Sequence, residues 1–183
     1  MILWRVLPWD PAARARDRGG PLYVPRVFQG QGRHDNPDRY GCLYLTSDPT
    51  SAVVEAIARF RGSGDLREEM LAREGRLLAM ARLELPDEAE LIDLDEPRVL
   101  ARERMRPSRV ATHDRAVTQA YAERLFDKHP DAAGIRWWST FESSWMNVTL
   151  FDRVWRRLRS RPPEPLTLDH PTVVEAAELL GLA

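Results

Sequence analysis

The sequence predicts an α+β protein, and three observations support this fold class. Strand-like and helix-like segments mix along the chain without a regular βαβ alternation. With 183 residues, 43% of them hydrophobic and 30% charged, the chain can bury a core of ordinary size. Cys42 is the only cysteine, which excludes an internal disulfide framework and is typical of a buried thiol in a reducing compartment.

The first half of the chain predicts two strands separated by a long loop. Branched and aromatic residues at 2–7, ILWRVL, are typical of a buried strand that ends at the following proline. Residues 8–41 show no sustained periodicity, and loops of this length are commonly functional or disordered. CLYLT at 42–46 is the next predicted strand. Asp48 and a proline after it predict a helix that runs to about Phe60.

The second half predicts further strands and helices in mixed order. Val117, Tyr121 and Leu125 recur at helical spacing, and Thr172 with Glu175 forms a capping-box pattern before a helix that Gly181 ends. The predicted strands are 76–85, 90–94, 134–141 and 147–151, and the predicted helices are 97–105, 113–127 and 172–181. We expect one domain over 1–159. A proline-rich linker and a helix at 160–183 would pack on that domain or form an oligomer contact.

Charge and hydropathy give no sign of nucleic acid or a membrane as a partner of this protein. The chain carries 27 basic and 28 acidic residues, so its net charge of −1 gives no reason to expect nucleic acid or an acidic membrane. The basic run at 153–161 is more typical of a cationic surface than of a nucleic-acid site. No apolar run has the length of a membrane span, and the first ten residues lack a signal-peptide pattern. We therefore expect a cytoplasmic protein.

Two charged residues stand where apolar residues are expected. Arg5 lies in the middle of the first predicted strand, and Glu55 lies inside the apolar helix segment AVVEAIA, where we expect it to be half-buried. Arg5 could pair with a carboxylate such as Glu55, lie on an edge strand with its side chain in water, or bind an anionic ligand. Glu55 could equally pair with Arg59 one helical turn later.

Three further residues are candidates with ordinary alternatives. Arg33 lies in the glycine-rich run GQGRHDNP, where a guanidinium could grip phosphate or be solvated. Tyr44 alternates with the leucines of its strand, so it is either core or a ligand platform. Ser139 ends a predicted strand, where serine usually bonds backbone or water. No metal site is indicated, because the four histidines and Cys42 lack metal-ligand spacing.

Four segments in register resemble the RES family, which is named for its arginine, glutamate and serine. They are LWRV at 3–6, GRHDNP at 32–37, YGCLYLTSDPTSAVVE at 40–55, and TQA followed by GIRWWS within 118–139. The resemblance spans about residues 2–152. It implies a fold similar to ADP-ribosyltransferases, with a mixed or antiparallel sheet surrounded by helices. RES proteins are typically toxins paired with an Xre-type antitoxin, and they destroy NAD by hydrolysis or phosphorolysis, or in some members ADP-ribosylate a protein.

The resemblance implies a role for each candidate residue. Glu55 matches the family's glutamate and would stabilise the oxocarbenium-like state formed when the nicotinamide–ribose bond breaks. Arg5 and Arg33 would hold the pyrophosphate, and Tyr44 would pack on nicotinamide or ribose. The functional hydroxyl is left open between Ser139 and Thr118. NAD would be the substrate, with no metal or further cofactor.

The family pattern also leaves alternatives open. In many members a single residue separates the arginine from the Asn-Pro pair, whereas His34 and Asp35 separate Arg33 from Asn36 here. The accepting group could be water, phosphate or a protein side chain, and a homo-oligomer is an open alternative. A non-catalytic relative that binds a nucleotide or docks a partner is the rival interpretation.

Overall fold

The computed structural model describes residues 1–183, which fold into two compact units. Unit 1 comprises residues 1–23, 46–84 and 159–183, and unit 2 comprises residues 24–45 and 85–158. The predicted boundary between residues 159 and 160 stays a prediction.

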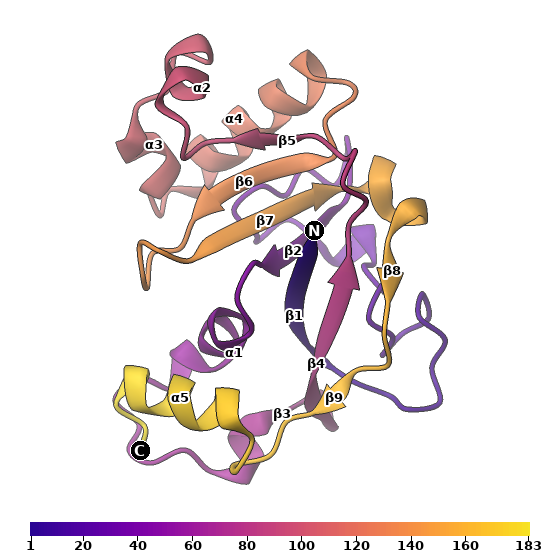
Figure 1. The fold of residues 1–183 in the computed structure, drawn as a ribbon, viewed down its shortest axis with the longest axis vertical. Helices are drawn as coiled ribbons and strands as arrows, with labels where there is room; N and C mark the ends of the chain where they lie inside the picture. The colour runs from indigo at the N-terminus through magenta and orange to yellow at the C-terminus, as the bar shows by residue number, and fades with distance from the viewer. The chain divides into compact units, whose positions relative to one another are not determined.

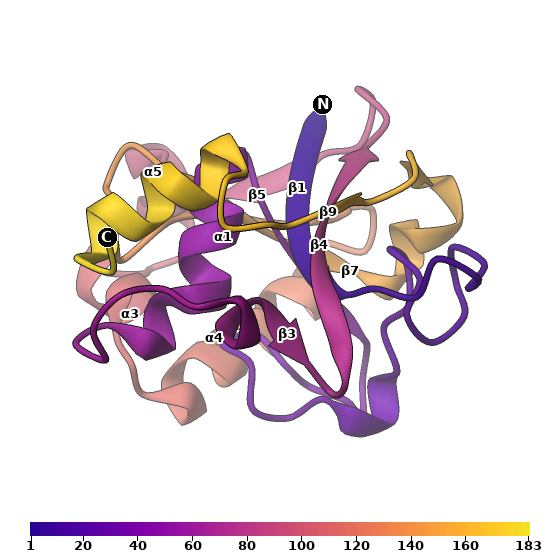
Figure 2. The same cartoon turned by 90° about the horizontal axis from the view of Figure 1, so that it is seen from below.

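Unit 1 is built on the long antiparallel pair of β1 and β4, which runs from Ile2↔Glu84 to Pro8↔Leu78 (Figure 2). The short strands β3, β8 and β9 all pair with β4, and β1 also pairs with the end of β2 through Trp4↔Thr46. The strands are β1 (Ile2–Pro8), β3 (Ala72–Arg73), β4 (Arg76–Glu84), β8 (Arg159–Ser160) and β9 (Glu164–Pro165). The helices are α1 (Pro49–Ile57) and α5 (Pro171–Leu180).

Helix α1 begins and ends as local sequence signals dictate. The carboxylate of Asp48 accepts a hydrogen bond from the backbone N–H of Ser51, and Pro49 occupies the first turn, where its missing N–H costs nothing. A 3₁₀ turn at Ala58–Phe60 completes the predicted helix. α1 packs against β1, β4 and α5, and Thr50 donates a hydrogen bond of 2.7 Å to Glu175 of α5.

The predicted capping box of Thr172 and Glu175 at the start of α5 is wrong. The N-cap of this helix is His170, whose Nδ1 accepts from the N–H of Thr172, because Pro171 takes the first helical position and shifts the start of the helix back. Glu175 bonds Thr50 instead of reaching back to the helix start. The predicted stop is confirmed, since Gly181 adopts the left-handed conformation at φ +67°.

Unit 2 contains a mixed sheet and a group of helices. β5 pairs with β6 in parallel, β6 pairs with β7 antiparallel, and β2 lies next to β7. Figure 1 shows α2, α3 and α4 together beside β5 and β6. The strands are β2 (Cys42–Thr46), β5 (Leu91–Asp93), β6 (Gly134–Trp138) and β7 (Met146–Phe151). The helices are α2 (Pro97–Arg102), α3 (Pro107–Ala111) and α4 (Arg115–Lys128).

The core of unit 2 joins these helices to the strands. Leu100, Val110, Tyr121 and Leu125 from the helices pack in one buried cluster with residues of β2, β5, β6 and β7 such as Ile135. Tyr121 and Leu125, which recur at helical spacing, are buried, while Val117 is half-buried.

The predicted α+β class with a mixed sheet and surrounding helices is confirmed. None of the helices combines the length and the apolar character needed to cross a bilayer.

Candidate functional site

The glycine-rich loop of unit 2 folds around the carboxylate of Asp35. This carboxylate accepts hydrogen bonds from the N–H of Gly30 at 2.8 Å, the N–H of Gly32 at 2.7 Å and the hydroxyl of Tyr44 at 2.7 Å. A Cβ on Gly32 would lie 2.4 Å from the Tyr44 hydroxyl oxygen, which is too close for any side chain. Residue 32 therefore has to be glycine for the loop to close on Tyr44.

His34 is fully buried and bonds through both ring nitrogens. Its Nδ1 lies 2.8 Å from the Thr149 hydroxyl, its Nε2 lies 2.8 Å from the Tyr121 hydroxyl, and its backbone N–H donates to Tyr44. Trp137 donates its indole N–H to the same Thr149 hydroxyl. Burial, aided by the positive charges of Arg33 and Arg115, holds the pKa of His34 well below its usual 6.5.

Arg33 is also buried, at 6% exposure, and bonds inside unit 2. Its Nη1 donates to the carbonyls of Val110 at 2.9 Å and Thr112 at 2.6 Å, at the end of α3. The guanidinium lies 4.8 Å from the ring centroid of Trp137. These contacts tie the loop to α3 and to β6, and the phosphate-binding role of Arg33 stays a prediction.

Tyr44 faces the loop from β2. Its hydroxyl donates to Asp35 and accepts from the backbone N–H of His34, and burial raises its pKa, so the phenol is neutral at all ordinary pH values. The ring is half-buried against the core of unit 2. Its predicted contact with nicotinamide or ribose stays a prediction.

The two alternative hydroxyls, Thr118 and Ser139, are both buried in unit 2 and bond backbone. Thr118 donates to the carbonyl of Arg115 within α4, at 3.2 Å. Ser139 follows β6, and its Oγ accepts from the N–H of Phe141 at 3.1 Å. Neither bond distinguishes the two as the functional hydroxyl, and the choice stays open.

Arg5 lies in β1 of unit 1. It neither pairs with a carboxylate nor lies on an edge strand, the two structural alternatives that the sequence left open. It makes no ion pair; its Nη1 donates to the carbonyls of Pro21 at 3.2 Å and Tyr23 at 3.5 Å. Nor is its strand an edge strand, since β1 pairs with both β4 and the end of β2. The Nε and Nη2 groups make no hydrogen bond within the protein. Burial lowers the pKa of Arg5 to about 10, so it remains a cation at neutral pH.

Glu55 lies on α1 of unit 1 and is exposed, so the expected half-burial is wrong. Val53, Val54 and Ile57 of the same helix are buried, which accounts for the apolar sequence around it. Arg59, one turn later, is exposed too, and its guanidinium lies 4.6 Å from the ring centroid of Phe60. The carboxylate at this position is therefore on the solvent-exposed face of α1.

The structure therefore places the six predicted residues in two groups. Arg5 and Glu55 belong to unit 1; Arg33, Tyr44, Thr118 and Ser139 belong to unit 2. Within unit 2, Arg33 and Tyr44 are brought together through the loop that contains His34 and Asp35.

Sequence patterns did not single out the residues that organise this loop. They considered the histidines, His34 among them, only to exclude a metal site, and they gave Tyr121 only as a residue at helical spacing. The hydrogen bonds of His34 to Thr149 and Tyr121 span 115 and 87 residues, so no short-range pattern could have revealed them. The adjacent polar pair His34–Asp35 in a glycine-rich loop was the available signal.

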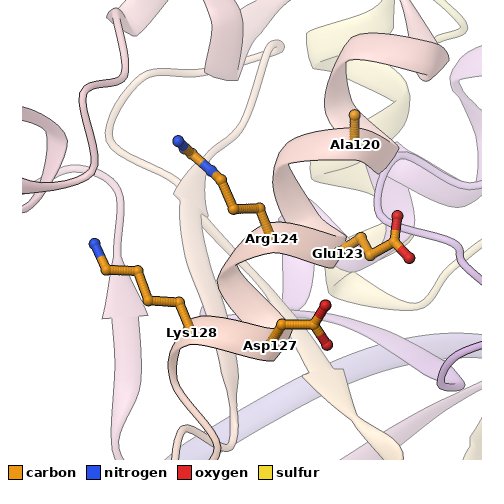
Figure 3. Close-up of a pocket in the computed structure, with 5 residues that line it drawn as sticks. All are labelled: Ala120, Glu123, Arg124, Asp127 and Lys128. Carbon is orange, nitrogen blue, oxygen red and sulfur yellow. The ribbon is translucent and has the colours of Figure 1, made fainter.

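The exposed face of α4 carries a depression of about 520 Å³ lined by charged residues, which bond other groups of the protein (Figure 3). Figure 3 shows Arg124 and Lys128 pointing to one side of the helix and Glu123 and Asp127 to the other. Lys128 bonds the buried carboxylate of Glu103 at 2.8 Å, and Asp127 accepts from Arg39 at 2.7 Å. We therefore do not assign it a substrate.

The buried thiol predicted for Cys42 is confirmed. Its Sγ donates to the carbonyl of His34, and burial raises the pKa of the thiol well above its usual value. A neutral, buried thiol is a poor nucleophile.

Neutral His34 makes the stability of the protein depend on pH in a defined direction. Above about pH 6.5 the ring is neutral in the folded and unfolded states and has no effect. As the pH falls below 6.5, only the unfolded state gains the proton, so the free energy of unfolding falls by about 1.4 kcal/mol per pH unit. We expect urea unfolding of the wild type to lose about 2 kcal/mol more stability between pH 7 and pH 5 than His34→Gln does. An equal loss in both proteins would show that His34 is not the group that titrates.

Comparisons with known proteins agree with this architecture. The model of the RES domain family matches residues 2–169, which extends the resemblance beyond residue 152 and through β8 and β9. A chain in the crystal structure of the M. tuberculosis MbcT–MbcA toxin–antitoxin complex has a TM-score of 0.63 and 16% identity. The alignment covers 98% of this chain and 88% of that chain. No curated protein matches the sequence.

The structural similarity shows a shared fold, the ADP-ribosyltransferase-like α+β fold that the sequence resemblance implied. The family model covers nearly the whole chain, and it includes the loop around Arg33, strand β2 and the helix that carries Glu55. The chain belongs to the RES domain family.

Proposed function

We propose that this protein consumes NAD by cleaving the bond between nicotinamide and ribose, as an NAD glycohydrolase or an NAD phosphorylase. The observation that carries the proposal is the RES family match across residues 2–169. By its place in the sequence pattern, Glu55 of α1 corresponds to the glutamate for which the family is named, and it is exposed.

The reaction defines what the protein has to supply. When the glycosidic bond breaks, its electron pair goes to the ring nitrogen of nicotinamide and neutralises that nitrogen's positive charge. The anomeric carbon of ribose becomes oxocarbenium-like until an oxygen of water or phosphate adds to it. A carboxylate beside the ribose stabilises this developing positive charge.

In this proposal Glu55 supplies that carboxylate. Because Glu55 is exposed, water screens its charge, so the bound dinucleotide itself has to displace water from it before its field becomes strong. Ribose hydroxyls would serve as hydrogen-bond donors to the same carboxylate.

Arg5 is the better supported of the two predicted phosphate ligands. The carbonyls of Pro21 and Tyr23 accept hydrogen bonds from Nη1 of its guanidinium. The N–H groups of Nε and Nη2 remain as donors for a ligand. A cation held in this way can donate to a pyrophosphate oxygen without first losing an internal partner. Arg33, Tyr44 and one hydroxyl, of Ser139 or Thr118, complete the proposed binding residues, and NAD is the substrate with no metal or further cofactor required.

We further propose that the protein is the toxin of a type II toxin–antitoxin system. Its structural neighbour comes from a toxin–antitoxin complex. The partner here would be an Xre-type antitoxin that covers the site. The test is induced expression in bacterial cells with the NAD pool measured over time. The proposal expects the NAD content to fall before growth stops, and an unchanged NAD pool in growth-arrested cells would contradict it.

The acceptor of the ADP-ribosyl group is decided by a product analysis. Purified protein is incubated with NAD in the presence and absence of phosphate, and the products are separated. Free ADP-ribose indicates hydrolysis, a phosphorylated ADP-ribose indicates phosphorolysis, and label transferred to protein indicates an ADP-ribosyltransferase, the alternative activity.

One observation favours a non-catalytic relative as the second candidate. Arg33 is buried and bonds the carbonyls of Val110 and Thr112, which is what a purely structural arginine would do. A non-catalytic binder would show a rise in its thermal unfolding midpoint with NAD but no release of nicotinamide.

A further inference from the structure

Residues 97–115 of unit 2, which include α2 and α3, are rich in exposed arginines. Against a net charge of −1 for the whole chain, this segment holds six arginines and two acidic residues, a net charge of +4. All six arginine side chains are exposed. We call them the α2–α3 arginines: Arg98, Arg102, Arg104, Arg106, Arg109 and Arg115.

These charges are not neutralised within the protein. Of the six, only Arg102 forms an ion pair, with Glu103 at 3.3 Å. Glu103 is itself 1% exposed and is already shared with Lys128 at 2.8 Å and His129 at 3.1 Å. The carboxylate of Glu103 is thus buried and shared among three cationic side chains. The other five arginines of the segment form no ion pair.

Arg104 occupies a backbone conformation that favours glycine. It follows α2 at φ +52°, and the turn closes with a bond from the N–H of Met105 to the carbonyl of Leu100. Glycine is the usual residue at such a helix end, because a Cβ is strained in the left-handed region. The side chain of Arg104 is exposed, so this backbone conformation presents its guanidinium to solvent.

The arrangement of the arginines suits carboxylates better than nucleic acid. Arg98 and Arg102 lie one turn apart on α2, so this pair can bind neighbouring acidic side chains. Arg106 is the N-cap of α3, and Arg109 lies within that helix. The segment contains no phenylalanine, tyrosine or tryptophan for stacking on bases, and the sequence pI of about 6.4 is far below that of typical nucleic-acid-binding domains.

We propose that the α2–α3 arginines form a docking surface for an acidic segment of a protein partner. The surface lies wholly within unit 2 and does not depend on NAD cleavage. It would steer a negatively charged segment to the protein, and its contribution would weaken as salt rises.

The test uses the full chain and a fluorescein-labelled decaglutamate peptide, with binding followed by fluorescence anisotropy at increasing salt. The wild type is expected to bind at low salt and to lose affinity as salt rises. Reversing two charges in Arg106→Glu/Arg109→Glu is expected to weaken binding at least tenfold. Arg156→Glu, at an exposed arginine elsewhere in unit 2, is a control that reverses one charge outside the segment and should leave the Kd unchanged.

Arg104→Gly gives an independent test, because loss of a purely structural residue would not weaken peptide binding while stability is kept. We expect it to weaken peptide binding about threefold while its thermal unfolding midpoint stays the same or rises, because glycine relieves the strained φ. Glu74→Gly removes the other strained side chain, at φ +53°, and should change stability in the same direction with no effect on the Kd.

Three outcomes would overturn the proposal. The first is no binding of decaglutamate at low salt. The second is an equal loss of affinity in Arg106→Glu/Arg109→Glu and in Arg156→Glu. The third is tighter binding of a duplex DNA of equal charge, which would assign the surface to nucleic acid.

Discussion

Replacing Glu55 by glutamine is expected to slow nicotinamide release from NAD by about 100-fold or more, equivalent to about 2.7 kcal/mol of lost transition-state stabilisation. Glutamine keeps the size of the side chain but removes the charge that would face the oxocarbenium-like ribose. Because Glu55 is exposed on α1, the change should leave the fold and its thermal midpoint nearly unaltered. Initial rates of nicotinamide formation at saturating NAD measure the effect.

Two control variants separate this role from a surface ion pair. Glu68→Gln removes another exposed glutamate of unit 1 and should retain full activity. Arg59→Gln removes the cation one turn after Glu55 and should change activity less than about threefold, since a surface pair contributes only tenths of a kcal/mol. If Glu55→Gln behaved like these two, Glu55 would be an ordinary surface residue.

Substituting alanine for Gly134 is expected to destabilise the protein by about 3 kcal/mol or more. Gly134 starts β6 opposite Leu150 of β7, and a Cβ there would lie 2.1 Å from the carbonyl oxygen of Thr149. The obstructing atom is backbone in a paired strand, so it can move only if β6 and β7 separate. Urea unfolding measures the loss.

The matched control for Gly134→Ala is Gly64→Ala. A methyl group on Gly64 would meet no neighbouring atom within 4 Å, but the φ of Gly64 is +82°, so alanine there should cost only the backbone strain of about 1 kcal/mol. Equal losses in the two variants would show that the β6–β7 pairing can relax around the added methyl group.

Local chemistry accounts for the parts of the fold that the sequence predicted. The strand at 42–46 and the start of α1 follow from β-propensity and from the Asp48–Pro49 cap, which are interactions between residues only a few positions apart. The turn at Gly181 was predictable for the same reason, since only the local φ decides it.

The parts that were missed depend on contacts far apart in the sequence. β8 and β9 lie in a proline-rich segment with no strand signal and exist because β4 offers them pairing partners. The short helix α3 has too few residues for a periodic pattern.

The candidate site shows the same division. Glu55 and Arg5 were noticeable because a charge in an apolar run is locally unusual. The predicted half-burial of Glu55 was wrong because its helix buries its other faces, and helical periodicity alone did not reveal which face residue 55 occupies. The carbonyl partners of Arg5 and the hydrogen bonds of His34 are tertiary contacts, which one sequence does not encode in any short pattern.

Cleavage of NAD is tested by the release of nicotinamide from NAD by the purified protein, followed over time by proton NMR. We expect nicotinamide to appear at a rate proportional to protein concentration, without phosphate if water is the acceptor and only with phosphate if phosphate is the acceptor, and we expect Glu55→Gln nearly to abolish it. Absence of nicotinamide in both conditions, from protein that circular dichroism shows to be folded, would show that the protein does not cleave NAD.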